Sequence, residues 1–140
     1  MTSIIRLNPL SLVDGPRFGF SHATVQHAGA TLHIAGQIAW DGKADLVGAQ
    51  DLALQTRQVL SNLLTVLHAG GCSPADIVHL RIYVVDTTPA KFRLVAQEIA
   101  FFYGGTVPAP STYLGVAGLA LPEFLIEIDA TAAIPAPGPR

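Results

Sequence analysis

The sequence feature that most constrains the fold is an alternating run near the C-terminal end. Its apolar members are Phe124, Ile126, Ile128 and Ala130, and between them lie Leu125, Glu127, Asp129 and Thr131. A period of two residues places each set on one face of a β-strand. The apolar face predicts burial against a core. The other face carries two carboxylates two residues apart, so it must meet solvent, a partner or a pocket.

The residues before this run predict a second strand. Pro108, Ala109 and Pro110 lead into an extended run over residues 111–117, and a turn around Leu121 and Pro122 follows. Prolines fit the approach to a strand better than its hydrogen-bonded interior. The two runs therefore predict a pair of strands that ends the domain.

Two helices are indicated by apolar residues at helical spacing. In residues 51–69 the apolar side holds Leu52, Val59, Leu63 and Val66 or Leu67, and the polar side holds Gln55, Arg57, Gln58 and Asn62. Gly70 and Gly71 end this helix, because glycine adopts the left-handed cap without steric cost. Thr88 followed by Pro89 predicts the start of the second helix. Its apolar positions are Phe92, Val95, Ala96, Ile99 and Phe102, and it stops at Gly104 and Gly105.

Three further strands complete the predicted α+β domain. Residues 20–27 and 31–38 are expected to pair as an antiparallel hairpin, a turn-rich loop spans 41–48, and β-branched residues mark a strand over 77–85. The order β-β-α-β-α-β-β predicts two helices packed on one face of a mixed sheet. Residues 1–17 are expected to be irregular, 18–133 to form the single domain, and 134–140 to be a disordered tail.

The composition indicates self-association. Only 13% of the 140 residues are charged, while 50% are hydrophobic. A typical soluble protein carries about 25% charged residues. A sheet with helices on one face also leaves its other face to be covered. Both observations predict a homo-oligomer.

The sequence disfavours several classes of protein. No apolar run reaches the ~18 residues of a membrane span, and the N-terminal residues lack the pattern of a secretory signal. One cysteine, Cys72, predicts no disulfide and a cytoplasmic location. Net charge −2 with dispersed basic residues disfavours nucleic-acid binding. The five histidines lack the spacing of a metal site.

Several segments together resemble the RidA family, also called the YjgF or L-PSP family. They are GFSHA at 19–23, AGQI at 35–38, QTRQ at 55–58, PADIV at 74–78, FF at 101–102, VPA at 107–109 and IEIDA at 126–130. The resemblance covers nearly all of residues 18–133. It implies a chorismate-mutase-like fold and a homotrimeric barrel with clefts between adjacent subunits. It also implies hydrolysis of enamines and imines to a 2-keto acid and ammonia, without a cofactor.

The chain departs from the residues that the resemblance implies for that activity. Pro110 stands where the family has an arginine that grips the substrate carboxylate. Phe20, Ala35 and Ala96 replace a tyrosine, a serine and an asparagine, and only the glutamate is kept, as Glu127. Because proline cannot imitate the two-pronged guanidinium contact, the cleft should bind a substrate less anionic than a 2-imino acid.

Glu127 has two interpretations. It is either a general acid/base that orients a water in an apolar cleft, where desolvation raises its pKa, or a structural carboxylate at a subunit seam. The expected cleft residues are Phe20, Ala35, Gly36, Trp40, Ala96, Pro110, Ser111 and Thr112. For Trp40, burial in the core or in a subunit contact is an equal alternative. Ser111, Thr112 and Tyr113 are either hydrogen-bond donors to the substrate or ordinary strand polarity.

Two hypotheses of function follow. The first is a homotrimeric RidA-like hydrolase of an imine, enamine or related small molecule, with Glu127 activating water. The second is a non-catalytic module that binds or senses a small molecule in the same cleft, suggested by the loss of four polar positions. A third, RNA cleavage, is disfavoured by the charge. His22 is the histidine expected nearest the cleft, and Asp129 is expected to be structural.

Overall fold

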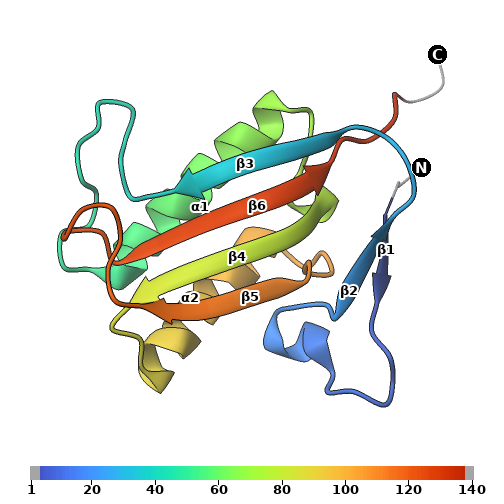
Figure 1. The fold of residues 1–140 in the computed structure, drawn as a ribbon, viewed down its shortest axis with the longest axis horizontal. Helices are drawn as coiled ribbons and strands as arrows, with labels where there is room; N and C mark the ends of the chain where they lie inside the picture. The colour runs from blue at the N-terminus through green and yellow to red at the C-terminus, as the bar shows by residue number, and fades with distance from the viewer. Residues whose placement is uncertain (1–3, 138–140) are drawn as a thin grey trace.

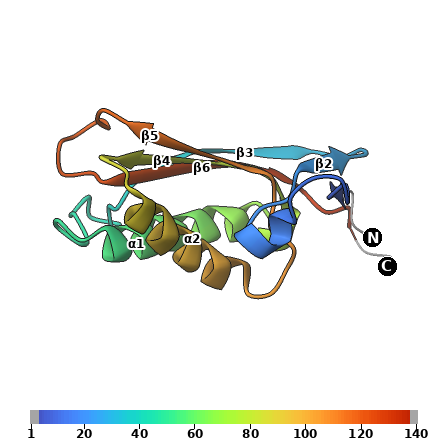
Figure 2. The ribbon, with the colours of Figure 1, turned by 90° about the horizontal axis from the view of Figure 1, so that it is seen from below.

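The computed structural model describes residues 4–137, and its centre is a four-stranded sheet with two helices on one face (Figures 1 and 2). The strands are β3 (Thr31–Gln37), β4 (Ile77–Val85), β5 (Ser111–Val116) and β6 (Ile126–Ala133), in the spatial order β3-β6-β4-β5. The helices are α1 (Leu52–Ala69) and α2 (Pro89–Tyr103). This arrangement confirms the predicted α+β fold.

The sheet is mixed, as predicted. Strand β6 pairs antiparallel with both β3 and β4, while β4 and β5 run parallel. The alternation in β6 decides the two faces, because Ile126, Ile128 and Ala130 are buried beneath the helices. Glu127 and Asp129 therefore lie on the helix-free face, which is turned toward the viewer in Figure 1.

Both helices begin at a capping side chain, and the cap at Thr88 is the one that the sequence predicts. The Asp51 side chain accepts a hydrogen bond from the Leu54 N–H at 3.0 Å, and the Thr88 hydroxyl accepts one from the Lys91 N–H at 3.2 Å. Each cap satisfies an N–H group that has no partner within its helix. Helix α2 ends at Gly104, which has a φ of 57°. This is the left-handed conformation that glycine favours.

The N-terminal region differs from the prediction. Ile4–Leu7 forms β1 and Ala23–Gln26 forms β2, and the two pair antiparallel in a separate sheet. Gly15–Phe18 is a short 3-10 helix, η1. The prediction of an irregular segment over 1–17 is therefore wrong for Ile4–Leu7 and for residues 15–17. The 20–27/31–38 hairpin is also wrong, because β3 pairs with β6. Residues 1–3 lie outside the described part of the chain.

Arg6 explains why this small sheet stays beside the domain. Its guanidinium donates to the Thr24 hydroxyl at 2.7 Å, to the Ala75 carbonyl at 3.1 Å and to the Ile77 carbonyl. These contacts join β1 and β2 to the start of β4. A basic residue in an apolar stretch gives no such signal in the sequence, since local pattern reading does not reach the distant segment that holds its carbonyl partners.

The tail predicted for residues 134–140 does not hold at its first residue. The Ile134 N–H donates to the Ala30 carbonyl at 2.9 Å, and the Ile134 side chain packs against the core. The tail prediction is thus wrong at residue 134, and residues 138–140 lie outside the described part. Within residues 4–137 no helix combines the length and the apolar character needed to cross a bilayer.

The sequence predicts Gln55 on the polar side of the first helix, and this is wrong. The residue is fully buried. Its amide nitrogen donates to the carbonyls of Gly48 (3.1 Å) and Glu123 (2.9 Å), and its amide oxygen accepts from the Leu125 N–H at 2.9 Å. One side chain therefore ties α1 to two loops and fixes the start of β6.

Candidate functional site

An apolar cavity of about 190 Å³ lies at the β5 edge of the sheet, between the sheet, helix α2 and residues 18–20. Its large apolar lining residues are Phe18, Phe20, Ile82, Phe92, Val95 and Ile99. Ala96 completes the helical wall, and Ser111 and Tyr113 supply the polar atoms from β5. No lining residue is charged.

Strand β5 contributes alternate side chains to this cavity. Ser111 pairs in register with Leu80 and Tyr113 with Ile82, two buried residues on the helix side of the sheet. Thr112 pairs with Arg81 and is exposed on the opposite face. The strand period therefore places Ser111 and Tyr113 in the cavity and Thr112 outside it.

The Tyr113 ring is fixed in place by two contacts. Its hydroxyl shares a 2.7 Å hydrogen bond with the Thr87 hydroxyl, and its ring meets Phe92 edge-on with centroids 5.0 Å apart. This leaves Ser111 as the hydroxyl without a hydrogen-bond partner among the described residues that line the cavity.

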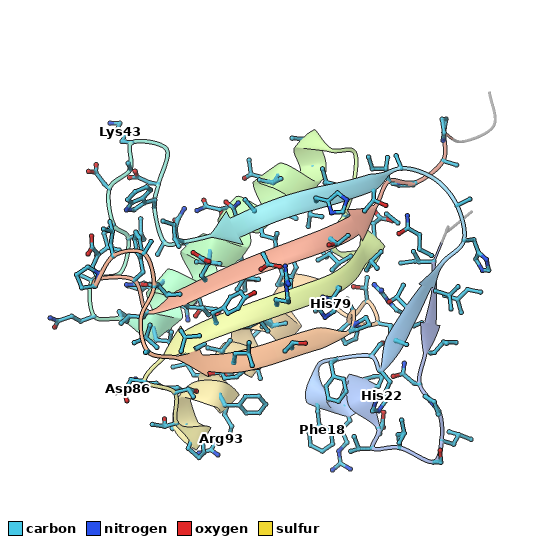
Figure 3. All side chains as sticks on the ribbon, in the orientation of Figure 1. Phe18, His22, Lys43, His79, Asp86 and Arg93 are labelled. Atoms are coloured by element: carbon cyan, nitrogen blue, oxygen red, sulfur yellow. The ribbon has the colours of Figure 1, made fainter. Side chains whose placement is uncertain are left out.

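Residues 18–20 form the third wall, and backbone hydrogen bonds of Phe20 and Ser21 hold this segment in place. The Ser21 N–H donates to the Ala109 carbonyl, and the Phe20 N–H donates to the Gly15 carbonyl, both at 3.1 Å. Figure 3 shows Phe18 on this segment and His22 just after it. The His22 ring meets Phe20 edge-on at 5.2 Å and its Nε2 contacts the Val13 carbonyl at 2.8 Å, so His22 supports a cavity residue from behind.

A second group of expected site residues lies on the helix-free face. The Glu127 side chain covers Gly36, since a Cβ added to Gly36 would lie 2.6 Å from Glu127 Oε2. Ala35 and Gly36 occupy the irregular part of β3, where the register with β6 shifts. Among residues 4–137 no hydrogen bond or ion pair engages the Glu127 carboxylate, which is half-buried.

Asp129, two residues along, is fully engaged. Arg81 Nε donates to its Oδ1 at 2.8 Å, and the Tyr83 hydroxyl donates to its Oδ2 at 3.1 Å. Arg81 and Asp129 are cross-strand partners, which places the two charges side by side. The expected structural role of Asp129 agrees with these contacts.

The electrostatic surroundings distinguish the two carboxylates. Desolvation raises the pKa of Glu127 above its ordinary value, and the negative charge of Asp129 raises it further. The pKa of Tyr83 is raised by desolvation and by its hydrogen bond to Asp129. A carboxylate without a cation partner and with a raised pKa is the kind of group that can act as a general acid or base.

Within one chain the sheet separates the two groups. Phe20, Ala96 and Ser111 meet in the cavity on the helix side, whereas Glu127 lies on the other face. Pro110 precedes β5, where its carbonyl accepts from the Leu80 N–H, and β4 stands between β5 and β6.

Trp40 and Gly36 line a different, open hollow beside β3. The Trp40 ring also meets Phe124 edge-on at 5.3 Å. Trp40 is thus partly packed on the core, one of the two alternatives left open by the sequence.

Sequence reasoning did not identify Phe18, Ile82 and Phe92 as site residues. Phe92 and Ile82 belong to apolar stripes that predict core burial. Their pattern therefore does not distinguish a residue that lines a cavity from one that is packed in the core. Among the described residues, no cluster of three or more His, Cys, Asp or Glu side chains is arranged to hold a metal ion.

The fold and the cavity define a class: a small α+β protein with two helices on a mixed sheet and a small-molecule-sized apolar cavity at the sheet edge. The model of the family described as Endoribonuclease L-PSP matches residues 15–134. A RutC family protein of Pyrococcus horikoshii is 37% identical over 106 residues, covering 75% of this chain and 80% of the relative. The chain belongs to the RidA/YjgF (L-PSP) family.

Solved structures agree with this assignment. A crystal structure of YyfB from Yersinia pestis, a Rid family protein of unknown function, has 50% identity and a TM-score of 0.92, covering 94% of this chain and 99% of that chain. A member of the YjgF/YER057c/UK114 family from Mycobacterium tuberculosis has 30% identity and a TM-score of 0.60, with the same coverage. The expected chorismate-mutase-like fold is therefore confirmed.

Proposed function

We propose that the protein is a cofactor-independent hydrolase of small imines or enamines that carry no required carboxylate. The observation that carries this proposal is the Glu127 carboxylate, half-buried, without a hydrogen-bond or ion-pair partner among residues 4–137 and with a raised pKa. Family membership supplies the reaction class. The uncharged cavity supplies the preference for a substrate without an anionic group.

The site is completed between two copies of the chain in this proposal. The cavity of one copy offers an apolar wall and the Ser111 hydroxyl, while the helix-free face of a neighbour offers Glu127. A homotrimer with a central barrel would cover that face. One support is the low charge of the chain, since only 13% of its residues are charged. The other is the position of Glu127 on the sheet face that no described helix covers.

The chemistry requires one water and one proton carrier. Glu127 accepts a proton from water while the water oxygen forms a bond to the C=N carbon. Glu127 passes the water proton to the nitrogen, which gives the carbinolamine. As the C–N bond breaks, the carbinol hydroxyl proton passes to the nitrogen, so that ammonia leaves and the carbonyl forms. The balanced reaction is R₂C=NH + H₂O → R₂C=O + NH₃.

The proposal is tested by measuring ammonia release from two imines generated in situ. One is 2-iminopropionate, which carries a carboxylate, and the other is benzaldimine, which does not. We expect the protein to accelerate the hydrolysis of benzaldimine, relative to the uncatalysed reaction, more than that of 2-iminopropionate. Glu127→Gln should lower the turnover of benzaldimine by about 10²-fold. Gly118→Ala, at a glycine with open space around its α-carbon, is the control. Lack of turnover of either imine, or full activity in Glu127→Gln, would remove the mechanism.

The alternative is a binding module that uses the same cavity without catalysis. It is favoured by the replacement of four polar family residues by Phe20, Ala35, Ala96 and Pro110. A thermal-shift screen separates the two functions. Saturable stabilisation by neutral small molecules, combined with no turnover of benzaldimine, would favour the module.

A further inference from the structure

We propose that the cavity beneath β5 is a specificity pocket for an uncharged, ring-sized apolar group, held by one hydrogen bond at Ser111. The inference names the substrate class for the proposed function. It rests on the proposed function only in taking this cavity to be the substrate-binding site. The claim about binding stands on the cavity itself.

The size of the cavity matches a six-membered ring. Its volume is about 190 Å³. An apolar cavity of about 150 Å³ in another protein stays dry and binds benzene. A phenyl or cyclohexyl group with a short substituent therefore fits, whereas a two-carbon side chain would leave much of the space empty.

The lining excludes charge on the bound group. None of the lining residues carries a charge, and Pro110, at the approach to β5, offers no side-chain donor. A carboxylate placed against Phe20, Val95 and Ile99, the more buried part of the lining, would lose hydration without gaining a partner, which is unfavourable. Neutral ligands avoid this cost.

One polar atom remains to orient the ligand. The Tyr113 hydroxyl is already paired with Thr87, and the Tyr113 ring is packed against Phe92. The Ser111 hydroxyl has no hydrogen-bond partner among the described residues. A ligand with a hydroxyl, carbonyl or imine nitrogen next to its ring can use that hydroxyl as donor or acceptor.

Ala96 determines how much space is left. It is half-buried on α2 among the cavity residues, and a longer side chain at this position extends into the cavity. Ala100, one turn further along the same helix, is exposed and lies outside this cavity. Leucine at each position therefore gives a matched pair, one filling the cavity and the other leaving it open.

The experiment is an NMR titration of the whole chain with three probes: benzyl alcohol, toluene and benzoate. We expect benzyl alcohol to bind most tightly and benzoate most weakly. Ala96→Leu should weaken benzyl alcohol binding by about tenfold or more, since a filled pocket loses the ring contacts. Ala100→Leu should bind as the wild type does. Ser111→Ala should abolish the advantage of benzyl alcohol over toluene.

Several outcomes separate this inference from the proposed hydrolase. Binding of benzyl alcohol without turnover of any imine would overturn the hydrolase and leave the pocket. Equal affinity for benzoate, or normal binding by Ala96→Leu, would overturn the pocket even if imines are hydrolysed. If Ala96→Leu does not fold by circular dichroism, Ala96→Val is measured instead, and normal binding by that variant counts against the pocket.

Discussion

The carboxylate of Glu127 lies directly over the α-carbon of Gly36, in the space that any larger residue at position 36 would occupy. A Cβ at Gly36 would be 2.6 Å from Glu127 Oε2 and 2.7 Å from its carboxyl carbon. Glycine at this position therefore determines where the carboxylate sits. The register of β3 against β6 shifts between Ile34 and Gln37, so Gly36 lies in an irregular part of the strand.

Gly36→Ala should lower catalytic turnover while leaving the fold intact. The added methyl group displaces the end of a flexible side chain, so the free energy of unfolding should change by less than about 1 kcal/mol. A shift of the carboxylate by about 1 Å can cost about 10²-fold in rate. The measurements are kcat/KM with benzaldimine and urea unfolding. Gly118→Ala controls for the substitution itself, and an unchanged rate in Gly36→Ala would show that the carboxylate position does not matter.

The rate should depend on the charge of Glu127. If its carboxylate form accepts the proton, kcat/KM is full above the pKa of Glu127 and falls as the pH drops through it. Desolvation and Asp129 raise that pKa, so the acidic limb should lie above the ordinary range of a glutamate.

Asp129→Asn removes one cause of the raised pKa and should move the acidic limb to lower pH. The control is Arg93→Gln, which changes a charge on α2, the helix packed on the opposite face of the sheet from Glu127 (Figure 3). An acidic limb that stays in place in Asp129→Asn, with Glu127→Gln showing the same profile, would exclude Glu127 as the titrating group.

Local patterns were sufficient for most of the fold. The alternation over residues 124–131, the cap at Thr88 and the glycine stops each depend on neighbours a few positions apart. The family resemblance then supplied the arrangement. The pairing of β1 with β2 was missed because its partners, such as Ile4 and Gln26, are not neighbours in sequence, and neither are Arg6 and the carbonyls that it binds.

The candidate site was less predictable for a different reason. Sequence places Phe20, Ala96 and Ser111 on three separate elements, and only the packing of α2 on the sheet shows that they share a cavity. Ser111 and Thr112 are adjacent in sequence yet face opposite sides of the sheet. Phe92 has the same helical spacing as core residues, so the sequence cannot show that it lines a cavity. Only the three-dimensional packing reveals the empty volume beside it.

Gln55→Leu should destabilise the domain strongly. Leucine fits the size of the site but leaves the Leu125 N–H and the Gly48 and Glu123 carbonyls without this partner. A buried group that loses its hydrogen bond costs about 1–3 kcal/mol, so the three groups together should cost at least about 3 kcal/mol. Urea unfolding measures it, and Gln97→Leu, at an exposed position on α2, is the control. A change as small as in Gln97→Leu would contradict the role of Gln55 as a clamp.

Tyr103 should make the protein sensitive to alkaline pH. Burial raises its pKa to about 12, and its hydroxyl oxygen accepts a hydrogen bond from the Ala109 N–H at 3.2 Å. Between about pH 10, where an unfolded tyrosine ionises, and pH 12, the folded state binds more protons than the unfolded state. The free energy of unfolding should therefore be unaffected by this group below pH 10 and fall by about 2–3 kcal/mol as the pH rises to 12.

Tyr103→Phe separates the hydrogen bond from the titration. At pH 8 the variant should be less stable than the wild type by about 1 kcal/mol, because the Ala109 N–H loses its partner. Between pH 10 and 12 the free energy of unfolding of the wild type falls through the titration of Tyr103, whereas the variant lacks this titration. The stability advantage of the wild type should therefore shrink and then reverse. Urea unfolding of both proteins across this range measures it. Parallel curves would mean that Tyr103 ionises in the folded protein as easily as in the unfolded chain, which its burial beside Ala109 opposes.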